Sequence, residues 1–128
     1  MWALDFMYGT LYYGRFFRTL NVIDESNREV LAIDVDMSLP AARVVRVMEQ
    51  LEEMVGLPKV IRLHNGSELR SGFFTSWCEA KGIELKLIQP GKPQQNTFIE
   101  RFNRTYRHEV LNAYIFESLE QVREITEE

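Results

Sequence analysis

The chain has 128 residues, of which 45% are hydrophobic and 27% charged, a composition typical of one globular domain over residues 1–128. No apolar run approaches the roughly 20 residues that a membrane-spanning helix requires, so we expect a cytoplasmic protein without membrane contact. The net charge of −4 excludes a protein whose whole surface binds nucleic acid, and any such contact must be local.

The first part of the chain predicts three antiparallel strands. Residues 2–8 are rich in strand-forming side chains, residues 9–14 indicate a turn, and residues 15–23 predict the returning strand. A polar turn then leads to a third strand over residues 29–35.

Helices and strands alternate in the middle of the chain. We expect Ser38 to cap a helix that has Pro40 in its first turn and ends at Gly56. Its apolar face holds Val44, Met48, Leu51 and Val55. A short strand over residues 59–63 follows.

The next predicted helix spans residues 71–81 and ends at Gly82, and residues 83–88 form the fifth strand. Its buried side chains are expected to be Phe73, Phe74, Trp77 and Cys78. The lone cysteine is therefore interpreted as a buried thiol rather than a ligand.

The last part of the chain predicts a loop at residues 90–93, a long amphipathic helix over residues 94–111 and a final helix over residues 119–127 capped by Ser118. This order of elements indicates an α/β fold: a five-stranded mixed sheet, its later strands parallel, with helices on both faces.

Asp5 lies between Leu4 and Phe6 inside the first predicted strand. Burying an isolated ionised carboxylate is costly unless it is paired or bound to a metal. The alternative is that the pleat of the strand points Asp5 into water.

Glu100 lies one residue past Ile99, which places it about 100° around the helix from the apolar stripe. That position suits a carboxylate aimed into a cleft beside the sheet. An exposed helical glutamate is the competing interpretation.

Three segments taken together are more specific than either carboxylate alone: WALDF at residues 2–6, IRLHNGSE at residues 61–68 and GKPQQNTFIERFN at residues 91–103. They resemble the three signature segments of insertion-sequence transposases of the retroviral-integrase type, and the resemblance covers essentially the whole chain. That family carries an acidic triad whose last two members are separated by 35 residues, the interval between positions 64 and 100 here. The resemblance implies a ribonuclease H-like fold.

The resemblance also implies a function. Asp5, His64 and Glu100 would be the catalytic and metal-binding positions, holding two Mg²⁺ or Mn²⁺ ions that assist hydrolysis of a DNA phosphodiester and attack by the freed 3′-hydroxyl. The implied partners are transposon-end and target DNA and further copies of the chain, with no small-molecule substrate. We expect the chain to be one module of a longer transposase.

His64 departs from the family pattern, which has an aspartate before Asn65 and Gly66. Imidazole offers one nitrogen and no negative charge, whereas Mg²⁺ prefers oxygen ligands. Impaired catalysis is therefore expected, and a catalytically inactive DNA-binding or multimer-assembly remnant is the alternative. A ribonuclease H-like nuclease unconnected with transposition fits less well, because such nucleases lack the Gly-Lys-Pro run before the glutamate.

Donor side chains precede Glu100 and are the expected DNA contacts: Lys92, Gln94, Gln95 and Asn96. Arg104 and Arg107 could follow the DNA backbone, or instead be solvated and paired with Glu109 or Glu100.

The second segment contains the residues expected to support the site. Asn65 and Gly66 suit a tight turn that orients residue 64, and Glu68 would support the same loop. Asp24 is a neighbouring acid that could replace the missing carboxylate, whereas His108 is expected at the surface.

Overall fold

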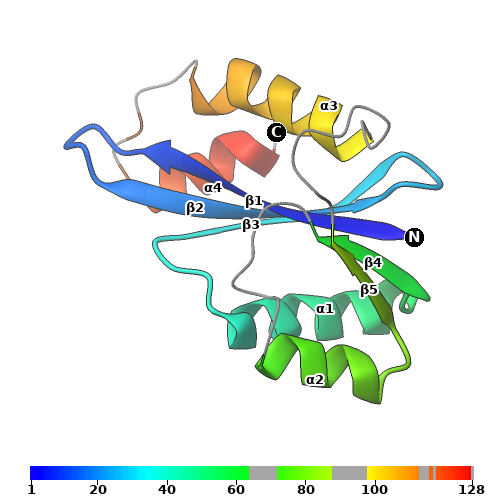
Figure 1. Cartoon of the computed structure of the whole chain (residues 1–128). Helices are drawn as coiled ribbons and strands as arrows, with labels where there is room; N and C mark the ends of the chain where they lie inside the picture. The colour runs from blue at the N-terminus through cyan, green and yellow to red at the C-terminus, as the bar shows by residue number, and fades with distance from the viewer. Residues whose placement is uncertain (64–71, 88–97, 113–115, 117, 128) are drawn as a thin grey trace.

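A five-stranded sheet runs through the middle of the protein, and helices cover both of its faces (Figure 1). The structure is a computed structural model that describes residues 1–63, 72–87, 98–112, 116 and 118–127. Of residues 87, 98–100 and 127 it describes the backbone alone.

The sheet has the strand order β3-β2-β1-β4-β5. Strands β1 (Trp2–Thr10), β2 (Phe16–Asp24) and β3 (Glu29–Asp36) form an antiparallel meander, while β4 (Val60–Leu63) and β5 (Glu84–Leu87) run parallel to β1. The predicted mixed sheet is confirmed, with strand ends within two residues of the prediction. Strand β1 lies at its centre.

Helices α1 (Ala41–Val55) and α2 (Phe73–Ala80) cover one face of the sheet (Figure 1). The opposite face carries α3 (Phe98–Tyr106), which continues as the π-helical turn η2 (Arg107–Leu111), and α4 (Leu119–Glu127). The helix predicted over residues 94–111 is thus confirmed from residue 98 onward, and residues 94–97 lie outside the described residues. No helix in the described ranges is long and apolar enough to span a bilayer.

The predicted start of α1 is wrong. Pro40, not Ser38, occupies the position before the helix, and its carbonyl oxygen accepts hydrogen bonds from the backbone N–H groups of Arg43 and Val44. Proline favours this place because it has no N–H to leave unpaired at the first turn. The helix does end at Gly56, whose φ of 86° is readily adopted only by glycine.

Two predicted core residues are exposed instead. Val55 is 60% exposed and Phe73 is 59% exposed. Helical spacing determines which side of a helix a residue occupies but not whether another element lies opposite that turn. Val55, at the end of α1, is on the predicted side of the helix but is exposed. Phe73 begins α2 about 100° around the helix from Phe74, which shares the buried face with Cys78.

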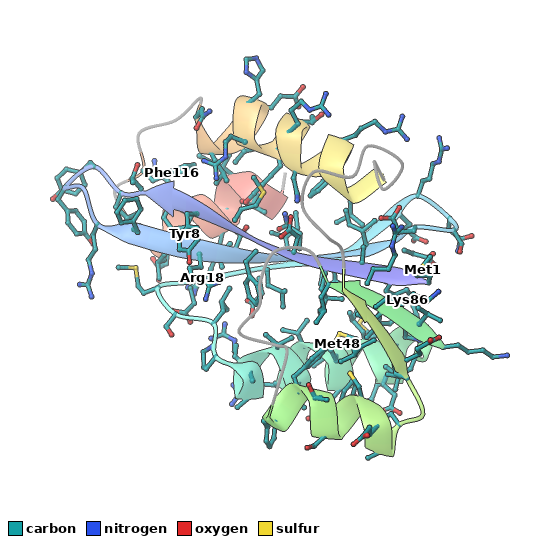
Figure 2. The ribbon with its side chains drawn as sticks, viewed as in Figure 1. Met1, Tyr8, Arg18, Met48, Lys86 and Phe116 are labelled. Atoms are coloured by element: carbon teal, nitrogen blue, oxygen red, sulfur yellow. The ribbon has the colours of Figure 1, made fainter. Side chains whose placement is uncertain are left out.

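Each face of the sheet has its own apolar core. Between the sheet and α1 and α2, Met48 of α1, which Figure 2 labels, belongs to the same buried cluster as Leu4 and Leu20. On the other face Phe116 packs edge-on against Phe17, with ring centroids 5.9 Å apart. Successive residues of β1 alternate between these cores because strand side chains point to opposite faces in turn.

Polar contacts fasten the helices of the second face. Ser118 caps α4 as predicted, its Oγ accepting the backbone N–H of Gln121 at 3.3 Å. The hydroxyl groups of Tyr106 and Thr126 lie 2.6 Å apart and join the end of α3 to α4. Arg123 of α4 donates to the carbonyl oxygen of Val35 in β3 at 2.6 and 3.1 Å. These contacts hold the layer that carries α3.

Candidate functional site

Asp5 lies near the middle of β1 on the face covered by α3 and α4. Its flanking same-face residues are Ala3 and Met7, and each belongs to an apolar cluster of that face. The side chain is 8% exposed, so the interpretation that the pleat points it into water is wrong. The central strand therefore brings a carboxylate into a nearly dry part of the molecule.

The Asp5 carboxylate is held by specific donors. The side-chain Nδ2 of Asn103 donates to Oδ2 at 2.5 Å, and the backbone N–H of Phe6 donates to Oδ1 at 2.8 Å. Asn103 lies on α3, 98 residues further along the chain. This hydrogen bond joins the central strand to the helix that carries Glu100.

A second asparagine extends the contact onto β2. Asn21 is the register partner of Asp5 and is fully buried. Its Nδ2 donates to Oδ1 of Asn103 at 2.7 Å and lies 3.2 Å from the sulfur of Met7, while its Oδ1 accepts the hydroxyl of Thr19 at 3.3 Å. A cluster of hydrogen-bonded polar side chains thus interrupts the apolar face of the sheet.

Apolar packing fixes α3 beside this polar cluster. Phe102 packs against Ala3 and Ile23, and its ring stacks on Tyr106 with centroids 5.8 Å apart. Tyr106 is buried in the apolar cluster that contains Phe17 and Phe116. Its burial raises the pKa of its hydroxyl. Asn103 therefore lies between two packed aromatic residues, Phe102 and Tyr106. It follows Glu100 by about one helical turn.

The structure brings together only part of the predicted triad. Asp5 and the backbone of Glu100 belong to packed elements, but the side chain of Glu100 is not described. Strand β4 ends at Leu63, whose register partner is Leu4, the residue before Asp5. His64 lies outside the described residues, as do the supporting residues Asn65, Gly66 and Glu68.

The chemistry of Asp5 fits a hard cation. A carboxylate is the kind of oxygen ligand that Mg²⁺ and Mn²⁺ prefer, and neutral amides of Asn103 and Phe6 are among the donors that orient it. Within the residues whose side chains are described, no group of three His, Cys, Asp or Glu side chains could hold a metal ion, and His64 and Glu100 are not among those residues.

Most of the predicted DNA contacts cannot be placed. Lys92, Gln94, Gln95 and Asn96 lie outside the described residues. Arg104 is exposed on α3. Arg107 is half-buried, and its guanidinium donates to the carbonyl oxygen of Tyr8 at 2.5 Å.

Asp24 is separated from the site. Its register partner is Trp2, three positions along β1 from Asp5, or about 10 Å at the rise of a strand. Its carboxylate accepts the backbone N–H groups of Ser26 and Asn27 at 3.0 and 3.2 Å and so forms the β2–β3 turn. The Asp24 carboxylate thus stabilises the turn between β2 and β3.

Two further expectations are confirmed. Cys78 is buried at 1% exposure, and burial raises the pKa of its thiol to about 11. His108 is exposed on η2.

Sequence reasoning missed Thr19, Asn21 and Asn103 as parts of the site. Thr19 and Asn21 were visible as polar residues at alternate positions in an apolar strand, which puts them on one face. Their pairing with β1 depends on the register of the hairpin, however, and the loop between the strands leaves that register open. For Asn103, helical spacing in the sequence predicts the side of the helix on which it lies but not the residue to which it is hydrogen-bonded.

Solved structures share this fold. The chain superposes on the HTLV-2 integrase catalytic core domain in complex with magnesium, trimeric form, with a TM-score of 0.69 and 16% identity over 97% of this chain and 79% of that one. The simian T-cell lymphotropic virus intasome gives a TM-score of 0.73 and 15% identity, covering 97% of this chain and 45% of that one. The ribonuclease H-like fold is thereby confirmed.

Sequence relatives are closer. The chain is 40% identical over 124 residues to a protein of insertion element IS476 from Xanthomonas euvesicatoria, covering 97% of this chain and 36% of the relative. It is 37% identical over 125 residues to a protein of insertion element IS407 from Burkholderia multivorans, covering 98% of this chain and 45% of the relative. The chain thus spans less than half the length of these relatives.

Two family profiles, both described as integrase core domain, match residues 1–93 and residues 81–128. The chain therefore belongs to the integrase core domain family, and its sequence relatives are proteins of insertion elements.

Proposed function

We propose that this chain is the catalytic core of a DNA transposase that cleaves a phosphodiester and joins the freed 3′-hydroxyl to target DNA. Asp5 and Glu100 would be its carboxylate ligands for Mg²⁺ or Mn²⁺, with His64 at the third ligand position. One observation carries the proposal: a nearly buried carboxylate on the central strand is hydrogen-bonded to the helix on which Glu100 lies.

The physical argument starts from the cost of that carboxylate. Placing the Asp5 carboxylate at 8% exposure costs free energy of folding, and the amides of Asn103 and Phe6 hold it in a fixed orientation. When bound, divalent cations in such a site lower the pKa of the attacking hydroxyl or water and stabilise the departing oxygen. Asp5 supplies an oriented hard oxygen ligand, and α3 carries Glu100 to the same face.

DNA binding is assigned to the segment before Glu100 and to α3. We propose that Lys92, Gln94, Gln95 and Asn96 contact the phosphate backbone together with Arg104. Arg104 is the better candidate of the two predicted arginines because Arg107 already donates to the Tyr8 carbonyl oxygen. With a net charge of −4, the chain would rely on such local contacts and on assembly into a homo-oligomer.

His64 supports a second candidate function. A histidine in place of a carboxylate removes one negative charge from the metal site, which weakens Mg²⁺ binding. The chain would then act as a DNA-binding or assembly module without catalysis, a role that needs the fold and the arginines but not the triad.

Calorimetric titration with Mg²⁺ and Mn²⁺ separates these possibilities. We would compare the natural chain with His64→Asp, and introduce Asp5→Asn or Glu100→Gln into each. Glu109→Gln is the matched control, since it removes an exposed carboxylate from the turn that continues α3. DNA cleavage and strand transfer on oligonucleotide ends would be followed in parallel.

We expect His64→Asp to tighten binding by roughly tenfold or more, because affinity follows the number of charged ligands, and we expect the gain to require Asp5 and Glu100. Mn²⁺ binding by the natural chain that depends on Glu100, with no change in His64→Asp, would show that the site accepts His64. Absence of binding in every variant would refute the proposed metal site. Strand transfer by the natural chain would rule out the non-catalytic function.

A further inference from the structure

We propose that Thr19, Asn21 and Asn103 form a directional hydrogen-bond relay that positions Asp5 for the cation, so that these three are positioning residues of the site. The inference rests on the proposed function, because it deepens the role given there to Asp5. It assigns a role to three polar side chains that are linked by hydrogen bonds to Asp5.

The relay is defined by three hydrogen bonds in series. The Thr19 hydroxyl donates to Asn21 Oδ1 at 3.3 Å, Asn21 Nδ2 donates to Asn103 Oδ1 at 2.7 Å, and Asn103 Nδ2 donates to Asp5 Oδ2 at 2.5 Å. Every step donates toward the carboxylate, which when ionised can only accept.

Burial makes each hydrogen bond of the relay costly to lose. Thr19 and Asn21 are both fully buried, so each polar atom left without a partner would cost about 1–3 kcal/mol. Turning the Asn103 amide over would set its carbonyl oxygen against Asp5 Oδ2 and its NH₂ against the NH₂ of Asn21. The Asp5 carboxylate, which can only accept, and Asn21 Nδ2, which donates, therefore favour the same orientation of the Asn103 amide.

The chemical type of the donors matters as much as their direction. A lysine or arginine at position 103 would pair with Asp5 and cancel the charge that a cation needs. A carboxamide orients the carboxylate without adding a charge of its own. Groups that orient metal ligands in this way commonly change metal affinity by 10–100-fold when they are altered.

The relay also links the strand that carries Asp5 to the helix that carries Glu100. Asn21 belongs to β2, Asp5 to β1 and Asn103 to α3, about one turn after Glu100. Because Asn103 is hydrogen-bonded to both strands, it fixes the distance between α3 and the sheet beside Asp5. A change at Asn21, which does not itself touch the Asp5 carboxylate in the relay, should therefore disturb metal binding.

The test uses Asn21→Asp, which preserves size but replaces the donor toward Asn103 with a negatively charged acceptor. Asn21→Leu, which is apolar and of similar size, serves if the aspartate variant does not fold. Asn112→Asp is the matched control, because it makes the same change at an exposed position past η2. Each is made in the full natural chain and in the His64→Asp background.

Two readouts are needed, with Mn²⁺ as the probe. Calorimetry measures Mn²⁺ affinity, and ¹⁵N-resolved NMR follows the side-chain amide protons of Asn103, whose resonance should move when the bond to Asp5 is lost. We expect Asn21→Asp and Asn21→Leu to shift that resonance and to weaken Mn²⁺ binding about 10–100-fold, with Asn112→Asp unchanged.

The outcomes distinguish the relay from the proposed function. If Asp5-dependent Mn²⁺ binding is present but folded Asn21 variants bind Mn²⁺ as the unaltered chain does, the relay is overturned and the metal site stands. If neither the natural chain nor His64→Asp binds Mn²⁺, the proposed metal site fails and the relay fails with it.

Discussion

Replacing Gly9 with alanine tests how tightly the hairpin beside the site is packed. Gly9 is buried in β1 opposite Phe17 of β2. A Cβ at this position would lie 2.3 Å from Cζ of Phe17 and 2.9 Å from Cε1 and Cε2, well inside van der Waals contact. The ring cannot move away freely, because Phe17 is fully buried and packs edge-on against the fully buried Phe116.

The expected cost follows from two opposing effects. Overpacking of this kind costs about 1–3 kcal/mol, while replacing glycine in a strand recovers roughly 0.5–1 kcal/mol of backbone entropy. We therefore expect Gly9→Ala to lower the free energy of unfolding by about 1–2 kcal/mol. For a domain of this size that corresponds to a fall in Tm of roughly 3–10 °C.

Thermal and urea unfolding followed by circular dichroism would measure this change. The diagnostic control is a double-mutant cycle with Phe17→Leu, because a smaller side chain should accept the new methyl group and give a coupling energy of at least about 1 kcal/mol. Gly14→Ala is the contrasting control: Gly14 has a φ of 86° and no atom within 4 Å of an added Cβ. Its cost should come from backbone strain and be independent of Phe17. A Gly9→Ala protein with unchanged or raised Tm would refute the reasoning.

Two further predictions concern titratable groups. Arg43 donates to Asp36 at 2.6 Å and holds the pKa of that carboxyl below its ordinary value of 3.8. A lowered folded pKa stabilises the protein above the unfolded value, and the contribution is lost as pH falls through the folded value. Arg43→Met should therefore raise the Asp36 pKa in a carboxyl NMR titration and move acid unfolding to higher pH. Lys81→Met, which breaks an exposed ion pair with Glu52, is the control. It should leave the Asp36 pKa and the pH of acid unfolding nearly unchanged. For Cys78, whose thiol pKa burial raises to about 11, native protein should react with a maleimide at pH 8 at least about 10³ times more slowly than urea-unfolded protein. Equal rates would show that the thiol is accessible without unfolding.

The order and type of the elements followed from local patterns. Alternating side chains predicted the strands, helical spacing predicted the helices, and Gly56 and Gly82 marked helix ends. Burial at the ends of elements did not follow, as Val55 and Phe73 show, because burial depends on what lies opposite. The start of α1 at Ala41 was likewise decided by the backbone around Pro40 rather than by the side chain of Ser38.

The sequence also predicted some features of the candidate site and left others open. Asp5 and Glu100 were identified from the sequence because the family motifs recur in order at a characteristic interval. The burial of Asp5 was undecidable there, since a strand residue can face either the core or water. His64 remains a prediction from the sequence alone.

The sequence by itself determined which residue types the chain can offer: two carboxylates in family motifs, a histidine at the third position, and polar residues at alternate positions in β2. Only the tertiary structure decided that Asn21 and Asn103, 82 residues apart, meet at Asp5. The physical reason is that strand register and helix docking are set by packing over the whole sheet. Local patterns indicate a face for each residue, but they do not determine which faces come into contact.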